Sequence, residues 1–179
     1  AISYAMLGKK VLLIDADMRK PTQRRLWRVE KPTGLCDFLA KISKLELDKV
    51  KDLPLWIVCT GTIPPNPSEL LSSERMKRFV EESAKVYDYI IIDTPPINTV
   101  ADAQIVSTYV DGVVLVVKSG DTTEDELNEA IDAVRRAGGN LCGTVLNDLN
   151  IKSVKYAYKY KYGGKYGYKY SYSESYEAR

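Results

Sequence analysis

The sequence contains no histidine, and this absence removes a large part of enzyme chemistry. Without imidazole there is no serine–histidine triad, no histidine general base and no histidine-ligated metal. Any catalysis by this chain must therefore use carboxylates, lysine, arginine, tyrosine and the backbone.

Cysteine and long apolar runs are also scarce. The three cysteines, Cys36, Cys59 and Cys142, lie far apart, and none belongs to a C-x-x-C pair. This spacing predicts neither a disulfide framework nor a zinc site and favours a reducing, cytoplasmic setting. No apolar run approaches the roughly 18 residues that a membrane span needs, and the first residues lack the pattern of a signal peptide.

The net charge of +2 conceals a strong asymmetry along the 179 residues. Residues 151–179 carry seven lysines and arginines against two glutamates, a net charge of +5, and hold nine of the thirteen tyrosines. Residues 1–151 are therefore predicted to form one globular domain, and residues 152–179 a disordered, basic, tyrosine-rich tail.

Apolar runs alternate with amphipathic segments along the globular part. Five runs predict strands: Val11–Ile14, Leu55–Thr60, Tyr89–Asp93, Gly112–Lys118 and Gly143–Leu146. Helical patterns lie between them: a helix end closed by Gly8, a short helix starting at Asn66, a longer one over Glu74–Tyr87, and one from the capping box Thr123/Glu126 to Gly138.

Strands that are apolar on both faces and alternate with helices are typical of a mostly parallel sheet. The sequence therefore predicts a doubly wound α/β fold with helices on both faces. Residues 21–39 are predicted to be polar, turn-rich chain.

Carboxylates follow several predicted strands. Asp15 and Asp17 come after the first, Asp93 ends the third, and Asp148 follows the fifth more weakly. In an open parallel sheet, ligands bind beyond the carboxyl ends of the strands. Asp93, between three isoleucines and Thr-Pro-Pro, has the form of a Walker B aspartate, which holds a magnesium-bound water. Each acid alone could equally form a turn, but two such strand ends in one sheet favour function.

The order of the motifs is more specific than any one of them. LLIDADMRKP, GTIPPNPSELLSSERM, YDYIIIDTPPINTVADAQIVSTYVDGVVLVVKSGDTT, GTVLN and a tyrosine cluster follow one another. This order closely resembles the bacterial tyrosine kinases (BY-kinases) of capsule and exopolysaccharide synthesis, over essentially the whole chain. In that family LLIDADMRKP is the Walker A′ motif and YIIIDTPP the Walker B motif. The resemblance implies a P-loop fold of the deviant Walker type, ATP and Mg²⁺ as cofactors, and phosphorylation of tyrosines in a neighbouring subunit's tail.

The resemblance also implies roles for particular residues. Asp15 matches the Walker A′ carboxylate near the metal and the incoming tyrosine hydroxyl, Asp17 the second Walker A′ acid, and Asp93 the Walker B acid; Asp15 and Asp93 would handle Mg²⁺, partly through water. Asn147 falls where related ATPases contact adenine, and Arg19 lies close enough in sequence to contact a phosphate. The matching autophosphorylation sites are Tyr156, Tyr158, Tyr160, Tyr162, Tyr166, Tyr168, Tyr170, Tyr172 and Tyr176.

The partners implied by the resemblance are a second copy of the chain, in a homo-oligomeric ring, a membrane activator or polysaccharide co-polymerase protein, and a tyrosine phosphatase; nucleic acid is not among them. The implied location is the cytoplasmic face of the plasma membrane, reached through the activator or a fused membrane domain.

One motif of the family is missing. The Walker A loop, G-x-x-x-x-G-K-S/T, is absent, and Gly8-Lys9-Lys10 closes a helix instead of following a strand. The family pattern predicts this loop and its strand immediately before Ala1, and the chain as written should bind ATP poorly. Two further interpretations stay open: a ParA/MinD-like regulatory ATPase and a non-catalytic subunit of the polysaccharide machinery. For the tail, the alternative is a generic nucleic-acid or membrane-surface binder.

Overall fold

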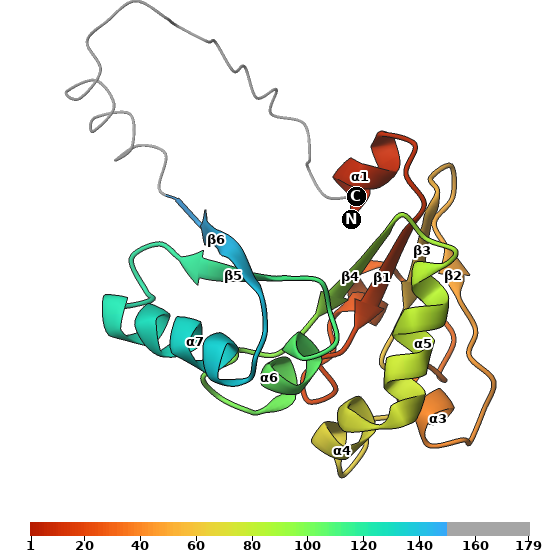
Figure 1. The fold of residues 1–179 in the computed structure, drawn as a ribbon. Coiled ribbons are helices and arrows are strands. Elements are labelled where there is room, and N and C mark those ends of the chain that lie inside the picture. Colours follow the sequence, from red (N-terminus) through yellow and green to blue (C-terminus); the bar gives the residue numbers. More distant parts are fainter. Residues whose placement is uncertain (150–179) are drawn as a thin grey trace, which may run out of the picture.

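The computed structural model describes residues 1–149, which form a four-stranded sheet flanked by helices and a separate strand pair (Figure 1). The tail predicted at residues 152–179 lies outside the described residues. The strands are β1 (Val11–Asp15), β2 (Asp48–Lys49), β3 (Leu55–Val58), β4 (Tyr89–Asp93), β5 (Val113–Lys118) and β6 (Leu141–Asn147). The helices are α1 (Ile2–Met6), α2 (Gln23–Leu26), α3 (Leu35–Leu39), α4 (Pro67–Ser72), α5 (Glu74–Ala84), α6 (Asp102–Ser107) and α7 (Glu124–Arg136).

β1 lies inside the larger sheet, whose strand order is β2-β3-β1-β4. It pairs in parallel with β3 on one side and with β4 on the other, and β2 adds to β3 in the antiparallel direction. The register places Asp15 opposite Asp93 at the carboxyl ends of β1 and β4. The predicted mostly parallel α/β architecture is confirmed.

The side chains of β1 alternate between two hydrophobic clusters, one on each face of the sheet. Leu12 and Ile14 pack with residues of α3, α4 and α5, whereas Val11 and Leu13 pack with Ala5 of α1 and with Trp27. All residues of β1 are buried. Burial of each such apolar side chain contributes about 1.5–3 kcal/mol, so a run without polar alternation forms the interior strand.

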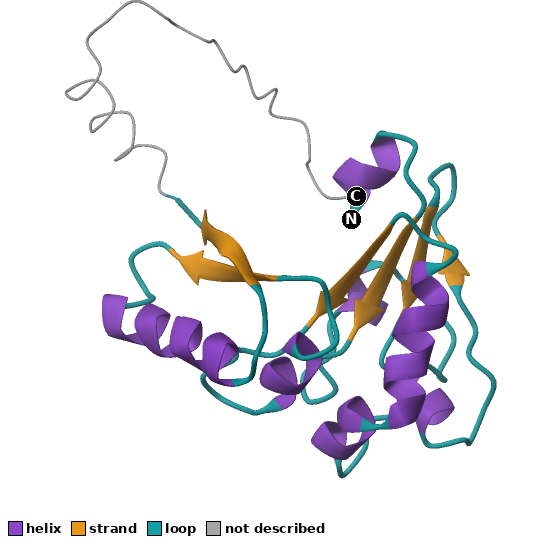
Figure 2. Ribbon diagram, in the orientation of Figure 1, coloured by secondary structure: helices purple, strands orange, loops and turns teal. Residues whose placement is uncertain are grey.

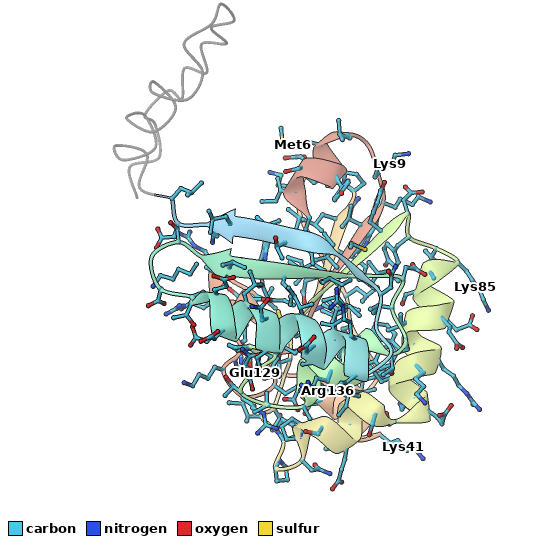
Figure 3. The ribbon with its side chains drawn as sticks, turned by 60° about the vertical axis from the view of Figure 1, so that its left-hand side comes forward. Met6, Lys9, Lys41, Lys85, Glu129 and Arg136 are labelled. Carbon is cyan, nitrogen blue, oxygen red and sulfur yellow. The ribbon has the colours of Figure 1, made fainter. Side chains whose placement is uncertain are left out.

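β5 and β6 pair in parallel, and α7 packs against them (Figures 2 and 3). The predicted capping box at the start of α7 is confirmed, because Thr123 and Glu126 exchange hydrogen bonds. Glu129 and Arg136, labelled in Figure 3, lie on the exposed side of this helix. Burial along β5 alternates, and Val114 and Val116 are 55% and 68% exposed although the strand is apolar throughout.

Two parallel strand edges have no partner among residues 1–149. β4 pairs only with β1, and β5 pairs only with β6. A cavity of about 1570 Å³ lies between them, lined by β4, by Val113–Val117 of β5 and by parts of α6 and α7. Figure 1 shows the corresponding separation of the two sheets. Each open edge presents backbone N–H and C=O groups of the kind that pair with a further strand.

The structure corrects several predicted boundaries. The stretch 21–39, predicted to be polar and turn-rich, contains the short helices α2 and α3, and the helix predicted to reach Tyr87 ends at Ala84. The strand predicted to end at Thr60 ends at Val58, and the last strand extends beyond its predicted bounds at both ends. The sequence predicts neither β2 nor α6, because both are too short for a periodic pattern.

The first helix, α1, exposes most of its apolar side chains. Gly8 follows it with a positive φ of 78°, as predicted for a helix end. Its apolar side chains are largely uncovered, however: Ala5 is buried, while Met6 and Leu7 are 74% and 75% exposed. Met6 projects from the end of α1 in Figure 3. None of the helices among residues 1–149 is long and apolar enough to cross a membrane.

Candidate active site

Two carboxylates meet at the carboxyl end of the larger sheet. Asp15 ends β1 and Asp93 ends β4, opposite each other in register. The Thr60 hydroxyl donates to the carbonyl of Asp15 at 3.0 Å, and the N–H of Ala16 donates to the carbonyl of Asp93 at 2.8 Å. These bonds fix the backbone of both acids, so the sheet itself holds the pair in place.

Asp15 is fully buried, and its two carboxylate oxygens have different surroundings. Oδ2 accepts the N–H of Gln23 at 3.0 Å, whereas Oδ1 is buried without a hydrogen-bond partner. Burial raises the pKa of Asp15, and the nearby Asp93 carboxylate raises it further against the opposing effect of the Gln23 hydrogen bond. A buried carboxylate oxygen without a donor is costly, and a cation at this position would offset that cost.

The donor set fits a magnesium–nucleotide complex better than a structural metal. Among residues 1–149, no group of three or more acidic, histidine or cysteine side chains could hold a metal ion. Mg²⁺ that is bound together with phosphates needs only one or two protein carboxylates, because it keeps several waters. Asp15 and Asp93 can supply those carboxylates.

Gln23 joins the two acids, although nothing in the sequence signals it. Its side-chain Nε2 donates to Asp93 Oδ2 at 2.7 Å, while its backbone N–H donates to Asp15. Its Oε1 accepts the indole N–H of Trp27 at 2.9 Å. One residue of α2 therefore contacts both carboxylates of the site.

Asp17 and Arg19 hold the loop that follows β1 in place through hydrogen bonds. The Asp17 carboxylate accepts the N–H groups of Arg19 and Lys20 at 3.1 and 2.9 Å, which closes a tight turn. The guanidinium of Arg19 binds Asp102 through Nε at 2.8 Å and Nη2 at 3.2 Å. The predicted catalytic role of Asp17 and phosphate contact of Arg19 stay predictions.

Asp102 is a fully buried acid that the sequence does not distinguish from other helix-starting acids. Besides the two bonds from Arg19, it accepts the hydroxyl of Ser68 at 2.6 Å. Burial alone would raise the pKa of Asp102, but the hydrogen bonds from Arg19 and Ser68 prevail and lower it. This network fastens the loop after β1 to the starts of α4 and α6.

Asn147 and Asp148 lie apart from this pair, on the strand pair β5–β6. Asn147 ends β6 opposite Lys118 and is exposed. Asp148 is also exposed and has a positive φ of 58°, which is typical of a turn. The adenine contact of Asn147 stays a prediction, and Asp148 does not reach the site through any hydrogen bond in the described part.

The fold and the paired acids define the class as a nucleotide-binding α/β ATPase of the P-loop type. Residues 1–141 match the family described as AAA domain. The septum site-determining protein MinD of Pyrococcus horikoshii, complexed with Mg-ADP, superposes with a TM-score of 0.68 over 84% of this chain and 62% of that chain. At 19% identity, this likeness shows the fold alone.

Within this class, the chain belongs to the bacterial tyrosine-protein kinases of capsule and exopolysaccharide loci. It is 42% identical over 161 residues to tyrosine-protein kinase YwqD of Bacillus subtilis, covering 88% of this chain and 68% of that protein. The kinase domain of the Escherichia coli tyrosine kinase ETK superposes with a TM-score of 0.80 at 31% identity, covering 95% of this chain and 63% of that chain. The predicted family and its enzyme class, protein-tyrosine kinase, are confirmed.

Proposed function

We propose that Asp15 and Asp93 form the magnesium-handling part of a site that transfers phosphate from ATP to tyrosines of a neighbouring copy's tail. The observation that carries this proposal is the buried pair, in register at the sheet edge, with one carboxylate oxygen unpartnered. Magnesium and ATP, when bound, supply the phosphoryl group and neutralise its charge.

Asp15 is suited to accept the proton of the incoming tyrosine. A tyrosine hydroxyl has a pKa of about 10 and reacts faster when an acceptor lies beside it. Burial raises the pKa of the Asp15 carboxyl, which makes the carboxylate a better base. Asp93, on the neighbouring strand, is left to hold the magnesium-bound water. The Arg19–Asp102 pair keeps the loop after Asp15 in one position.

We propose that the open edges of β4 and β5 pair with a further parallel strand. We place the Walker A loop before Ala1, on a parallel strand that would fill the cavity of about 1570 Å³ and pair with both edges. The helix after the loop would continue into α1 and cover the exposed Val114 and Val116. Without this loop, the chain lacks the N–H cradle and lysine that bind phosphates, and we expect weak ATP binding.

Oligomerisation would bring one copy's tail to another copy's site. Our proposal is a ring-forming homo-oligomer that works with a membrane activator at the inner face of the plasma membrane and is reversed by a tyrosine phosphatase. The family membership supports this arrangement. Each phosphate adds about −1.5 to −2 charges, so a few modifications would reverse the tail's charge of +5 and weaken its attraction to acidic surfaces.

The test uses the chain joined to an N-terminal segment that carries G-x-x-x-x-G-K-S/T, because phosphoryl transfer needs a phosphate-binding loop. Asp15→Ala and Asp93→Ala should each abolish phosphorylation of residues 156–176, measured by mass spectrometry after incubation with Mg-ATP. Asp132→Ala removes an exposed acid of α7 and should leave the modification unchanged. Phosphorylation that persists in both site variants would contradict the assignment of these acids.

A further inference from the structure

Gln23 lies between the two acids of the site and donates a hydrogen bond to each. It contacts Asp15 through its backbone and Asp93 through its side chain, at 3.0 and 2.7 Å. No lysine or arginine side chain in the described part is hydrogen-bonded to either carboxylate, and the nearest candidate in sequence, Arg19, is engaged by Asp102. The two carboxylates therefore accept hydrogen bonds from the neutral amide groups of Gln23.

These donors and a divalent cation compete for the same oxygens. A carboxylate accepts N–H donors and binds Mg²⁺ through the same lone pairs. A magnesium ion or its bound water at Asp93 Oδ2 would take the position of the Gln23 Nε2. We propose that Gln23 is a positioning residue that holds the cation site closed, and that divalent-cation binding displaces its amide and shifts α2. This inference rests on the proposed magnesium site.

Displacement of α2 should require little free energy. None of its four residues is buried, and Leu26 is 64% exposed. A segment with few buried contacts opens at lower free energy than the core around it. The loop immediately before α2 differs, because Asp17 and the Arg19–Asp102 pair fasten it. The expected motion is therefore local to α2 and the Trp27 that follows it.

Trp27 reports this motion without any activity assay. Its indole N–H donates to Gln23 Oε1, so displacement of the glutamine changes the surroundings of that proton. The chain contains one other tryptophan, Trp56, which lies on β3 and packs its ring against Tyr87. Trp56 thus serves as an internal reference.

The experiment titrates MgCl₂ into the ¹⁵N-labelled full chain at constant ionic strength and follows the two indole N–H signals, assigned with Trp56→Phe. Wild type should show a shift of the Trp27 signal and not of the Trp56 signal. Gln23→Ala should bind Mg²⁺ about tenfold more tightly, because one competing hydrogen bond to a charged group is gone. Its Trp27 signal without Mg²⁺ should already lie near the Mg²⁺-saturated position of wild type.

The controls separate this inference from the site on which it rests. Gln104→Ala removes the other glutamine, whose amide bonds to the carbonyl of Ile97 outside the acid pair, and should behave as wild type. If Asp93→Asn abolishes Mg²⁺ binding but Gln23→Ala leaves affinity and the Trp27 response unchanged, the magnesium site stands and the role of Gln23 is overturned. If wild type and Gln23→Ala bind no Mg²⁺ at any concentration at which the chain stays soluble, the inference fails, because Gln23 then competes with no cation; the magnesium–nucleotide site is decided separately by the phosphorylation of the Asp15→Ala and Asp93→Ala variants.

Discussion

β1 and β5 have similar sequences and very different surroundings. Both are parallel strands made almost entirely of Val, Leu and Ile. β1 has a strand on each side and a hydrophobic cluster on each face, and all its residues are buried. β5 has one strand neighbour, α7 against it, and every second residue exposed.

The difference shows that an apolar run predicts a strand suited to burial but does not show how much of that strand is buried in the structure. The pattern of β5 is suited to burial on both faces, as in the interior of a doubly wound sheet. Within residues 1–149, however, every second residue of β5 is exposed, and a cavity lies between β5 and β4. The larger sheet should therefore tolerate substitutions less well than the β5–β6 pair, and four pairs of variants test this.

The largest difference is expected between two leucines on strands. Leu12 on β1 is fully buried, and Leu146 on β6 is 52% exposed. Leu12→Ala should lower the free energy of unfolding by about 4 kcal/mol, because it leaves a cavity in the core, and Leu146→Ala by about 1 kcal/mol or less. Urea unfolding monitored by circular dichroism measures both. Equal losses would show that the β5–β6 pair is as well packed as β1.

Two glycines with positive φ give the next pair. Gly61, after β3, has a φ of 81°, and an added Cβ would collide with the Asp37 carboxylate and the backbone of Gly34. Gly120, after β5, has a φ of 76° and open space around it. Gly61→Ala should cost about 3 kcal/mol from strain and overlap, and Gly120→Ala about 1 kcal/mol from strain alone.

Thermal unfolding of the two glycine variants checks this order. A Gly120→Ala variant as unstable as Gly61→Ala would mean that the turn after β5 is as tightly constrained as the contact between Gly34 and Gly61.

Asp37, on α3 beside the larger sheet, offers a pH-dependent test. Its Oδ2 accepts the N–H groups of Gly34 and Thr62 at 2.9 and 3.0 Å. Burial alone would raise the pKa of Asp37, but these hydrogen bonds prevail and lower it. The charged Asp37 carboxylate therefore stabilises the folded protein at pH values above the ordinary carboxyl pKa of about 4. This stabilisation is lost as the pH falls through the lower pKa of the folded state.

Asp37→Asn should therefore cost about 2 kcal/mol near neutral pH, with a deficit that shrinks below the ordinary carboxyl pKa. The control is Asp132→Asn on α7, whose acid is exposed and pairs, among residues 1–149, only with Arg135; it should change stability little at any pH. Chemical unfolding across a pH series measures both. A deficit of Asp37→Asn that is constant down to acid pH would contradict the role of its charge.

The smallest difference is expected between two helix caps. The Ser73 hydroxyl accepts the N–H of Met76 at the start of α5, and the Thr123 hydroxyl accepts that of Glu126 at the start of α7. Both contacts are local, so Ser73→Ala and Thr123→Ala should each cost about 1 kcal/mol. Thermal unfolding compares them. A much larger loss for one would mean that its cap also carries tertiary contacts.

The parts of the fold that the sequence predicts are those with a strong local signal. The strands β1, β4 and β5 follow from continuous apolar runs, and α7 follows from its capping box and its glycine stop. α2, α3, α6 and β2 lack such signals, because a short element owes its conformation to contacts that are distant in sequence. The apolar residues of α1 likewise do not predict that, among residues 1–149, Ala5 is the only buried residue of this helix.

The candidate site also contains residues that the sequence predicts and residues that it does not. Asp15 and Asp93 can be found from the sequence because each follows an apolar run, and parallel strands bring their carboxyl ends to one edge. Gln23 and Asp102 cannot be found, since their roles depend on hydrogen bonds to residues 70 and 83 positions away.

The sequence by itself determined the class of fold, the family and the two acids, because apolar runs, caps and motif order are local properties of the chain. Only the tertiary structure decided which groups donate hydrogen bonds to those acids, where the Arg19 guanidinium lies, and that β4 and β5 have open edges beside a cavity. The physical reason is that hydrogen bonding, burial and strand pairing are properties of neighbours in space. A pattern in the sequence predicts that a residue will be buried or paired, but it does not identify the residues that surround it.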